Sequence, residues 1–370
     1  MTGALWEIGA LRALDELLDR SVLDLDLYVG VSGGAFVSTL LAAGVSPREM
    51  YDEAVAGRPL GRVVPLFRLG LREVLARSRQ APGVLFRALV EALPGRAGSL
   101  SDAALSLFEL LPAGLLDSSG VRESVAEILK RRGVADQFDA LARPLRVVAV
   151  DLDRGEAVAF GSRTRRDVPV SRAVQASAAL PGLYRPVRIG GRDYVDGGVK
   201  KTAHVNLAIR EGARLVLCIN PMVPLRNDGD HRPLPGPLSG RGVAYVLDQA
   251  LRIMLHGRMQ YGLERYRAEH PEVDILLMEP DPEDLRMFRY NILRYDARRV
   301  VAELGYRATR QAFRRRRRAY ARVLARHGIG LRDPSRIPEA PEPARGGRSP
   351  LAQALGDSLE RLEARLGARR

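Results

Sequence analysis

The sequence predicts an α/β fold in which a mostly parallel central sheet is flanked by helices. Apolar runs typical of buried strands occur at 145–150, 215–220 and 273–278. The second and third runs each follow a segment whose apolar residues have helical spacing, and strands that alternate with helices favour parallel pairing. The chain has 370 residues, 46% of them hydrophobic, so it can bury one large core or two smaller ones.

The beginning of the chain predicts a helix, a strand and a second helix in close succession. Residues 4–20 predict the first helix, because leucine and isoleucine recur there every three residues. Residues 25–29 read Leu-Asp-Leu-Tyr-Val and predict a short strand. Residues 35–43 predict a second helix, which ends at Gly44.

The region 46–135 predicts a helical cap inserted into the sheet, because prolines interrupt its short helical patterns. Strand patterns resume at 145–150 and 157–160, and residues 187–195 predict a hairpin that turns at Gly190 and Gly191. Two long helices are predicted further on, at 242–267 and 295–326.

We therefore expect one domain over residues 1–330, with the cap as an insertion. Residues 331–370 are predicted to form a tail. Its first part, 333–350, is rich in Pro, Gly and Arg and is predicted to be a disordered linker. A weak amphipathic pattern at 351–366 predicts a short terminal helix.

The formal net charge of +14 is concentrated in part at an unbroken basic run, Arg314–Arg318. Three interpretations remain open for this run: attraction to an anionic membrane surface, nucleic-acid binding, or a solvated helix face. The run lacks a recognised nucleic-acid-reading motif and has little aromatic interleaving, so we expect no specific nucleic acid as a partner.

The single cysteine, Cys218, lies within an apolar run and is predicted to be an inert, buried thiol. One cysteine cannot form a disulfide within the chain, which favours a reducing compartment. The sequence shows no signal-peptide pattern and no apolar stretch of about 18 residues, so we expect a cytoplasmic protein that can be peripheral to a membrane. No histidine, cysteine or carboxylate cluster has metal-ligand spacing, so no metal and no cofactor is expected.

A G-x-S-x-G motif joins the first predicted strand to the second predicted helix. The motif runs from Gly30 through Ser32 to Gly34. Glycines on both sides of the serine allow a sharp turn that exposes its hydroxyl group. The helix that follows points its N–H groups toward that oxygen and favours negative charge there. This pattern is typical of a nucleophile elbow.

A second motif, Asp196-Gly197-Gly198, follows the predicted hairpin. On its own it is read as a turn, because Asp-Gly is a common turn dipeptide. Together with the distant G-x-S-x-G motif, however, it resembles the patatin-like phospholipases, a family of serine acyl hydrolases. The resemblance extends to Gly9–Leu14, Val150–Glu156 and Ala176–Val187 and covers about residues 3–220.

The resemblance implies a three-layer patatin-like fold and a Ser–Asp dyad, with Ser32 as the nucleophile and Asp196 as its partner. The implied substrate is a phospholipid or another acyl ester, cleaved through an acyl-enzyme. Gly33 and its neighbours Gly30 and Gly34 would form the elbow and part of the oxyanion hole, and Gly197 and Gly198 would support the aspartate.

The chain departs from the family pattern at its beginning. The family has a first strand and a G-G-G-x-x-G loop whose N–H groups complete the oxyanion hole. Here only Gly3 can match the end of that loop. We expect the true start to lie upstream. The alternative is a catalytically impaired protein that binds lipid or membranes.

A histidine-containing triad is another interpretation, because all five histidines follow Asp196 and the order Ser, Asp, His fits α/β-hydrolases. In those enzymes several strands precede the elbow, whereas one is predicted here. His204 is better explained as a residue at the start of a helix. The histidines concerned are His204, His231, His256, His270 and His327.

Overall fold

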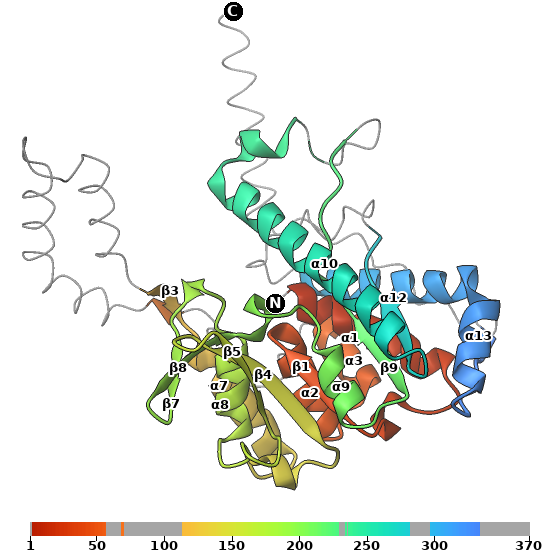
Figure 1. Cartoon of the computed structure of the whole chain (residues 1–370), viewed down its shortest axis with the longest axis horizontal. Helices are drawn as coiled ribbons and strands as arrows, with labels where there is room; N and C mark the ends of the chain where they lie inside the picture. Colours follow the sequence, from red (N-terminus) through yellow and green to blue (C-terminus); the bar gives the residue numbers. More distant parts are fainter. Residues whose placement is uncertain are drawn as a thin grey trace, which may run out of the picture. The chain divides into compact units, whose positions relative to one another are not determined.

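The computed structural model describes residues 2–56, 68–69, 113–228, 234, 236–281 and 297–333. Its helices are α1 (Thr2–Leu17), α2 (Gly33–Ala42), α3 (Pro47–Ala56), α7 (Ser119–Arg131), α8 (Val170–Ser177), α9 (Val205–Arg210), α10 (Val243–Glu269), α12 (Ala297–Arg315) and α13 (Arg317–Ala325). Short 3-10 helices lie at η1 (Val22–Asp24), η2 (Phe138–Ala140), η3 (Gly197–Val199) and η5 (Leu238–Arg241). Figure 1 shows how these elements follow one another.

The central sheet is built around β4 (Leu145–Asp151), a strand whose residues are all buried. The strand β1 (Tyr28–Val31) pairs with β4 in parallel. Three further strands join in antiparallel pairs, namely β5 (Glu156–Phe160), β7 (Val187–Ile189) and β8 (Arg192–Asp196). The predicted hairpin is confirmed, with Gly190 and Gly191 both at positive φ between β7 and β8.

Two smaller sheets accompany the central one. The strands β9 (Leu215–Ile219) and β10 (Asp274–Met278) pair in parallel, as expected for strands that a helix connects. The third sheet consists of β2 (Arg68–Leu69), β3 (Gly114–Asp117) and β6 (Gly182–Tyr184). The predicted α/β fold with flanking helices is confirmed. Parallel pairs occur in each of the three described sheets, and the central sheet adds antiparallel pairs to its parallel pair β1–β4.

Helices cover the central sheet, with α2 packed against β1 and α8 packed against β4 and β8. Most of the predicted cap at 46–135 lies outside the described residues. Its described parts are α3, β2, β3 and α7, and α7 packs against α8. The predicted tail beyond residue 333 also lies outside the described residues, whereas Leu331 forms a bridge to Leu18 at the end of α1.

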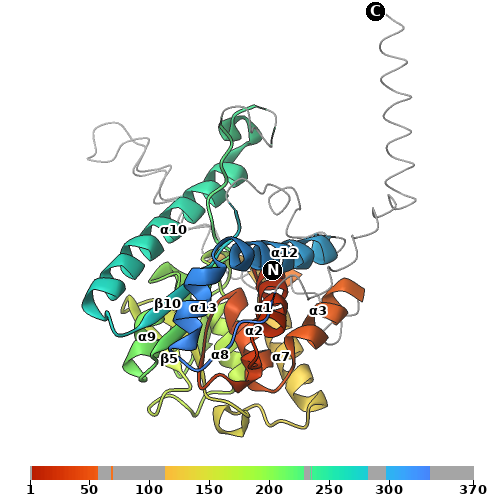
Figure 2. The ribbon, with the colours of Figure 1, turned by 90° about the vertical axis from the view of Figure 1, so that its right-hand side faces the viewer.

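The helices α1 and α12 lie side by side although they come from opposite ends of the described chain (Figures 1 and 2). Their backbones approach closely at two glycines. A Cβ atom added to Gly9 would lie 1.8 Å from the carbonyl oxygen of Ala302, and one added to Gly305 would lie 2.1 Å from that of Trp6. Because backbone atoms cannot yield as a flexible side chain can, both positions require glycine.

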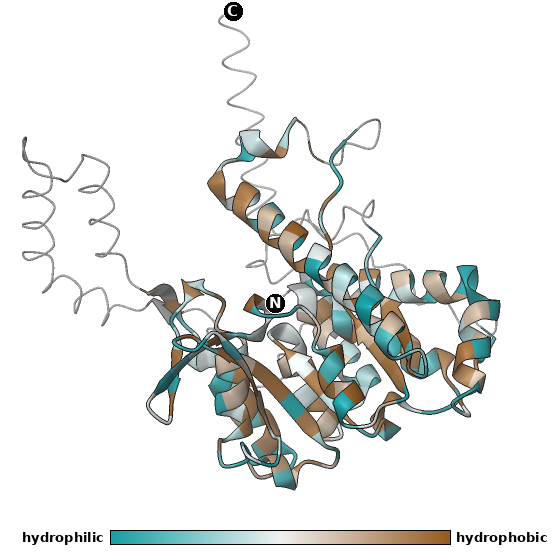
Figure 3. Ribbon diagram, viewed as in Figure 1, coloured by the Kyte–Doolittle hydropathy of each residue, from teal (hydrophilic) through white to brown (hydrophobic). Residues whose placement is uncertain are grey.

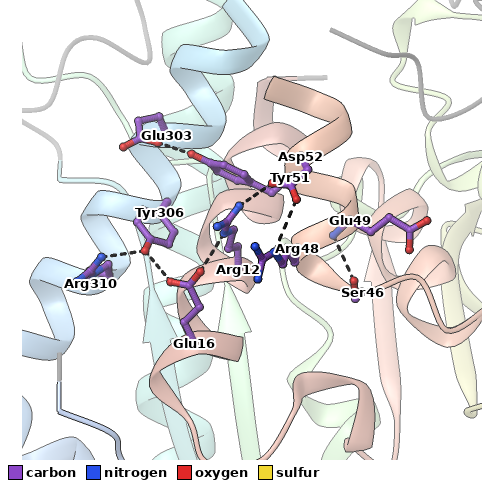
Figure 4. A network of polar contacts seen from close by, with 10 residues as sticks. All are labelled: Arg12, Glu16, Ser46, Arg48, Glu49, Tyr51, Asp52, Glu303, Tyr306 and Arg310. Carbon is purple, nitrogen blue, oxygen red and sulfur yellow. Dashed lines mark hydrogen bonds and ion pairs between the residues drawn. The ribbon is translucent and has the colours of Figure 1, made fainter. Parts of the chain in front are cut away.

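A polar network also joins α1, α3 and α12 (Figure 4). Arg12 bonds to Glu16 of its own helix at 3.0 Å and to Asp52 of α3 at 2.8 Å. The hydroxyl group of Tyr306 donates to Glu16 at 2.6 Å, and that of Tyr51 donates to the buried carboxylate of Glu303. The network therefore fixes α12, which lies beyond the G-x-S-x-G and D-G-G motifs in the sequence, against α1 and α3.

Candidate active site

Ser32 occupies the tip of a sharp turn between β1 and α2. Its backbone angles are φ 54° and ψ −123°, and among the described residues it is the one non-glycine residue with a positive φ. Such a conformation costs about 1–3 kcal/mol and persists only where the surroundings enforce it. At Gly30 a Cβ atom would lie 2.5 Å from the Cα atom of Ala35, so the turn closes only without a side chain there.

Ser177, at the end of α8, holds this strained turn in place. Its hydroxyl oxygen accepts a hydrogen bond of 2.9 Å from the backbone N–H of Ser32. The same hydroxyl group donates a bond of 2.6 Å to the carbonyl oxygen of Val148 in β4. Ser177 is completely buried, so neither bond competes with water. The strained turn is thereby connected to the central strand of the sheet.

The register of the sheet brings Ser32 and Asp196 together. One edge of β4 pairs with β5, and the other edge pairs with both β1 and β8. On that second edge, Val31 of β1 is the partner of Val148, and Asp196 of β8 is the partner of Ala149. The last residue of β1 and the last residue of β8 are therefore paired with neighbouring residues of β4. Ser32 directly follows Val31, the last residue of β1, so Ser32 and Asp196 lie side by side although they are far apart in the sequence.

The carboxyl group of Asp196 is buried beside Ser32. Burial raises its pKa to about 6, while hydrogen bonds from the Ser32 hydroxyl group and from the N–H of Gly198, the latter 2.8 Å long, act in the opposite direction. A Cβ atom on Gly197 would lie 2.4 Å from the carbonyl oxygen of Val148. Glycine at this position therefore allows the turn after Asp196 to pack directly on β4.

The N-termini of two helices meet at the elbow. The helix α2 begins at Gly33, and a Cβ atom placed there would lie 3.4 Å from the backbone nitrogen of Ala4 in the first turn of α1. Gly3 lies in the same turn, where a Cβ atom would lie 3.0 Å from the Cγ atom of Pro221. Backbone N–H groups in the first turn of a helix lack helical partners and carry partial positive charge. The surroundings of the Ser32 hydroxyl group therefore favour an anion.

The Glu7 carboxyl group also lies beside the elbow, since a Cβ atom on Gly34 would be 3.3 Å from its Oε2 atom. Burial raises the pKa of Glu7 to about 8. The group is therefore mostly protonated at neutral pH and places no full negative charge next to the helix N-termini. The sequence offered no signal for this position, because Glu7 fits an ordinary amphipathic helix.

The described histidines bond to groups other than Ser32 and Asp196. His204 precedes α9, as predicted, and its Nε2 atom lies 3.4 Å from the carbonyl oxygen of Gly197. Burial lowers its pKa to about 4. His256 pairs with Glu279, His270 with Glu272 and His327 with Asp274. His231 lies outside the described residues.

Cys218 is buried in β9, and burial raises the pKa of its thiol to about 12, consistent with an inert packing role. Lys200 donates to the carbonyl oxygen of Gly155, and Lys201 donates to the hydroxyl group of Tyr266. Within the described ranges, no group of three or more His, Cys, Asp or Glu residues could hold a metal ion, and no helix is long and apolar enough to cross a membrane.

Comparisons with known proteins agree with the motifs. The patatin-like phospholipase family matches residues 1–209. The chain is 19% identical over 203 residues to the probable lipid hydrolase 463L of Invertebrate iridescent virus 6, a match that covers 55% of this chain and 58% of the viral protein. It is 28% identical over 114 residues to the uncharacterized protein YqhO of Bacillus subtilis, covering 28% of this chain and 39% of that protein.

The crystal structure of VipD from Legionella pneumophila aligns with 90% of this chain and 66% of its own, with 15% identity and a TM-score of 0.39. The family match covers more than half of the 370 residues and includes Ser32 and Asp196. The chain belongs to the patatin-like phospholipase family.

Proposed function

We propose that the chain is a lipid acyl hydrolase that cleaves carboxylic esters through a Ser32–Asp196 dyad. The observation that carries this proposal is the strained turn of Ser32 beside the buried carboxyl group of Asp196. Membership of the family and the similarity to a probable lipid hydrolase favour a lipid ester as the substrate.

The proposed reaction begins when the Ser32 oxygen attacks the carbonyl carbon of the ester. Asp196 accepts the hydroxyl proton, a role that suits a carboxylate with a pKa of about 6, because it is ionised at neutral pH yet basic enough to take a proton. The negative charge that develops on the carbonyl oxygen is stabilised by the N–H of Gly33 and the adjoining N-terminus of α1. The alcohol leaves with that proton, and water then releases the acyl group from Ser32.

The test is the hydrolysis of a soluble short-chain p-nitrophenyl ester by the parent chain, Ser32→Ala and Asp196→Asn. Both variants should lose on the order of a thousandfold or more in kcat/KM. Ser38→Ala, on the same helix, and Asp193→Asn, on the same strand, are the matched controls and should retain parental turnover. Equal turnover by the parent and Ser32→Ala would contradict the dyad.

The alternative, a lipid-binding protein without catalysis, makes a different prediction in the same assay. It expects no turnover above background from the parent chain, while binding to lipid vesicles persists. Turnover that depends on both Ser32 and Asp196 would exclude it.

A further inference from the structure

The long helix α10 presents one face to the protein core. Leu255, Met259, Leu263 and Tyr266 are buried there at helical spacing. Three of them belong to an apolar cluster that also contains Cys218 of β9 and Ile275 of β10. This face accounts for the packing of α10 against the rest of the described protein.

The opposite face of α10 is also apolar, although it is exposed. A surface helix ordinarily has polar residues on its outward side. Here large hydrophobic side chains continue along that side from Val243 to Tyr261, over about 27 Å of helix. Figure 3 shows the hydrophobic colouring along this part of α10. The exposed fractions are 72% for Val243, 44% for Val246, 63% for Leu247, 53% for Ile253, 57% for Met254 and 71% for Tyr261. We call these six residues the outer stripe.

The one charged side chain on the outward side of α10 between Val243 and Tyr261 is basic. Between Val243 and Tyr261 the outward side carries the exposed Arg258 and no carboxylate, since Asp248 points toward the other side and pairs with Arg252. Arg241 precedes the stripe. The exposed Glu264 and Arg265 follow it, and Arg265 pairs with Glu269. An apolar strip with the exposed Arg258 beside it, on a chain of net charge +14, complements an anionic lipid surface, where acyl chains accept the apolar side chains and phosphates attract the positive charge.

The helix α10 itself contacts the turn that follows Asp196. Arg258 donates hydrogen bonds to the carbonyl oxygens of Val199, at 3.0 Å, and Lys200. The hydroxyl group of Thr202 donates to the carbonyl oxygen of Leu255 at 2.7 Å. Val199 and Lys200 are themselves exposed, so an apolar and a basic side chain extend the surface toward the D-G-G turn.

We propose that the outer stripe docks the protein onto an anionic phospholipid bilayer, with α10 lying in the plane of the interface. Docking would present a lipid next to the turn that carries Asp196. The identity of that lipid as substrate rests on the proposed function, whereas the docking itself does not.

The experiment measures binding to phosphatidylcholine vesicles with and without phosphatidylglycerol. It uses the full chain carrying Ser32→Ala, so that no lipid is consumed. Adding Leu247→Glu and Ile253→Glu should weaken binding on the order of tenfold or more, because both side chains would enter the bilayer. Leu152→Glu, the same change at a leucine that is 50% exposed outside α10, is the matched control and should bind as the parent does.

Unchanged vesicle binding by the double variant, or an equal loss in Leu152→Glu, would overturn the proposal. So would a parent dimer that the double variant dissociates, because a second copy would then cover the stripe. If the double variant melted several degrees below the parent without vesicles, another part of the chain would cover the outer stripe, and the proposal would also fail. In the chain with Ser32 intact, Leu247→Glu and Ile253→Glu should leave turnover of the soluble ester at the parental level, which separates this docking from the chemistry at Ser32.

Discussion

Replacing Asp196 by asparagine should abolish activity and at the same time stabilise the fold. In the structure the Asp196 carboxyl group is buried, and burial raises its pKa from the ordinary value of 3.8 to about 6. Ionising it inside the protein therefore costs more than ionising it in the unfolded chain. Asparagine keeps the shape of the side chain and can still accept the hydrogen bond from the N–H of Gly198.

The magnitude and its pH dependence follow from this difference. At a pH between the two pKa values the folded protein holds a proton that the unfolded chain has lost, so stability falls as the pH rises from about 4 to about 6. Above pH 6 the loss is complete and amounts to about 3 kcal/mol. An asparagine side chain does not ionise, so the variant has no such loss. It should therefore exceed the parent in stability by up to about 3 kcal/mol at pH 7, and by little at pH 4.

Urea denaturation of the parent and Asp196→Asn at several pH values between 4 and 8 measures this difference. Ester hydrolysis over the same range should rise about tenfold between pH 5 and pH 8 in the parent, as Asp196 becomes ionised and able to accept the proton. An asparagine variant that is less stable than the parent at pH 7, or a stability gain that does not shrink toward pH 4, would refute the assignment of a buried, functionally ionised carboxylate.

Three further predictions concern other parts of the fold. Gly305→Ala should destabilise the protein by about 1–3 kcal/mol in a denaturation experiment, because the added Cβ atom meets the backbone of Trp6. Gly257→Ala, on the exposed side of α10 with open space around it, should instead stabilise the protein by up to about 1 kcal/mol. Ser177→Ala should cost about 1–3 kcal/mol and lower kcat, because the Ser32 N–H and the Val148 carbonyl lose their partner; a parental kcat would contradict its role in holding the elbow. Replacing the arginines of Arg314–Arg318 by glutamine should weaken binding to anionic vesicles, and binding that responds neither to these changes nor to salt would count against a lipid role for the run.

The elbow could be predicted from the sequence because its requirements are local. Glycines around Ser32 permit the turn, and apolar residues on both sides mark the strand and the helix. The strand itself begins later than predicted, at Tyr28 rather than residue 25, because its partner β4 begins only at Leu145. The pairing of two strands sets that boundary, and the pattern of one strand does not reveal it.

The contacts that support the site depend on residues far apart in the sequence. Gly9 lay in a segment that resembles the family, but nothing indicated that it would face Ala302 across 293 positions. Ser177 likewise lay in a segment with family resemblance, although no local pattern predicts a buried hydroxyl group that bonds to Ser32.

The single helix predicted at 295–326 is wrong in one respect. It is interrupted at Arg316 and continues as α13. The interruption lets the buried rings of Phe313 and Tyr320 meet edge to face, with centroids 4.7 Å apart. Neither glycine nor proline marks this break, since packing rather than backbone preference sets it.

The reactivity of Ser32 tests the central claim most directly. A fluorophosphonate probe, which phosphonylates an activated serine, should label the parent chain at Ser32, as located by mass spectrometry of the digested protein. Labelling should disappear in Ser32→Ala and fall on the order of a hundredfold or more in Asp196→Asn, because the carboxylate no longer takes the proton. A label on another residue, or equal labelling of Ser32 in the parent and Asp196→Asn, would contradict the dyad.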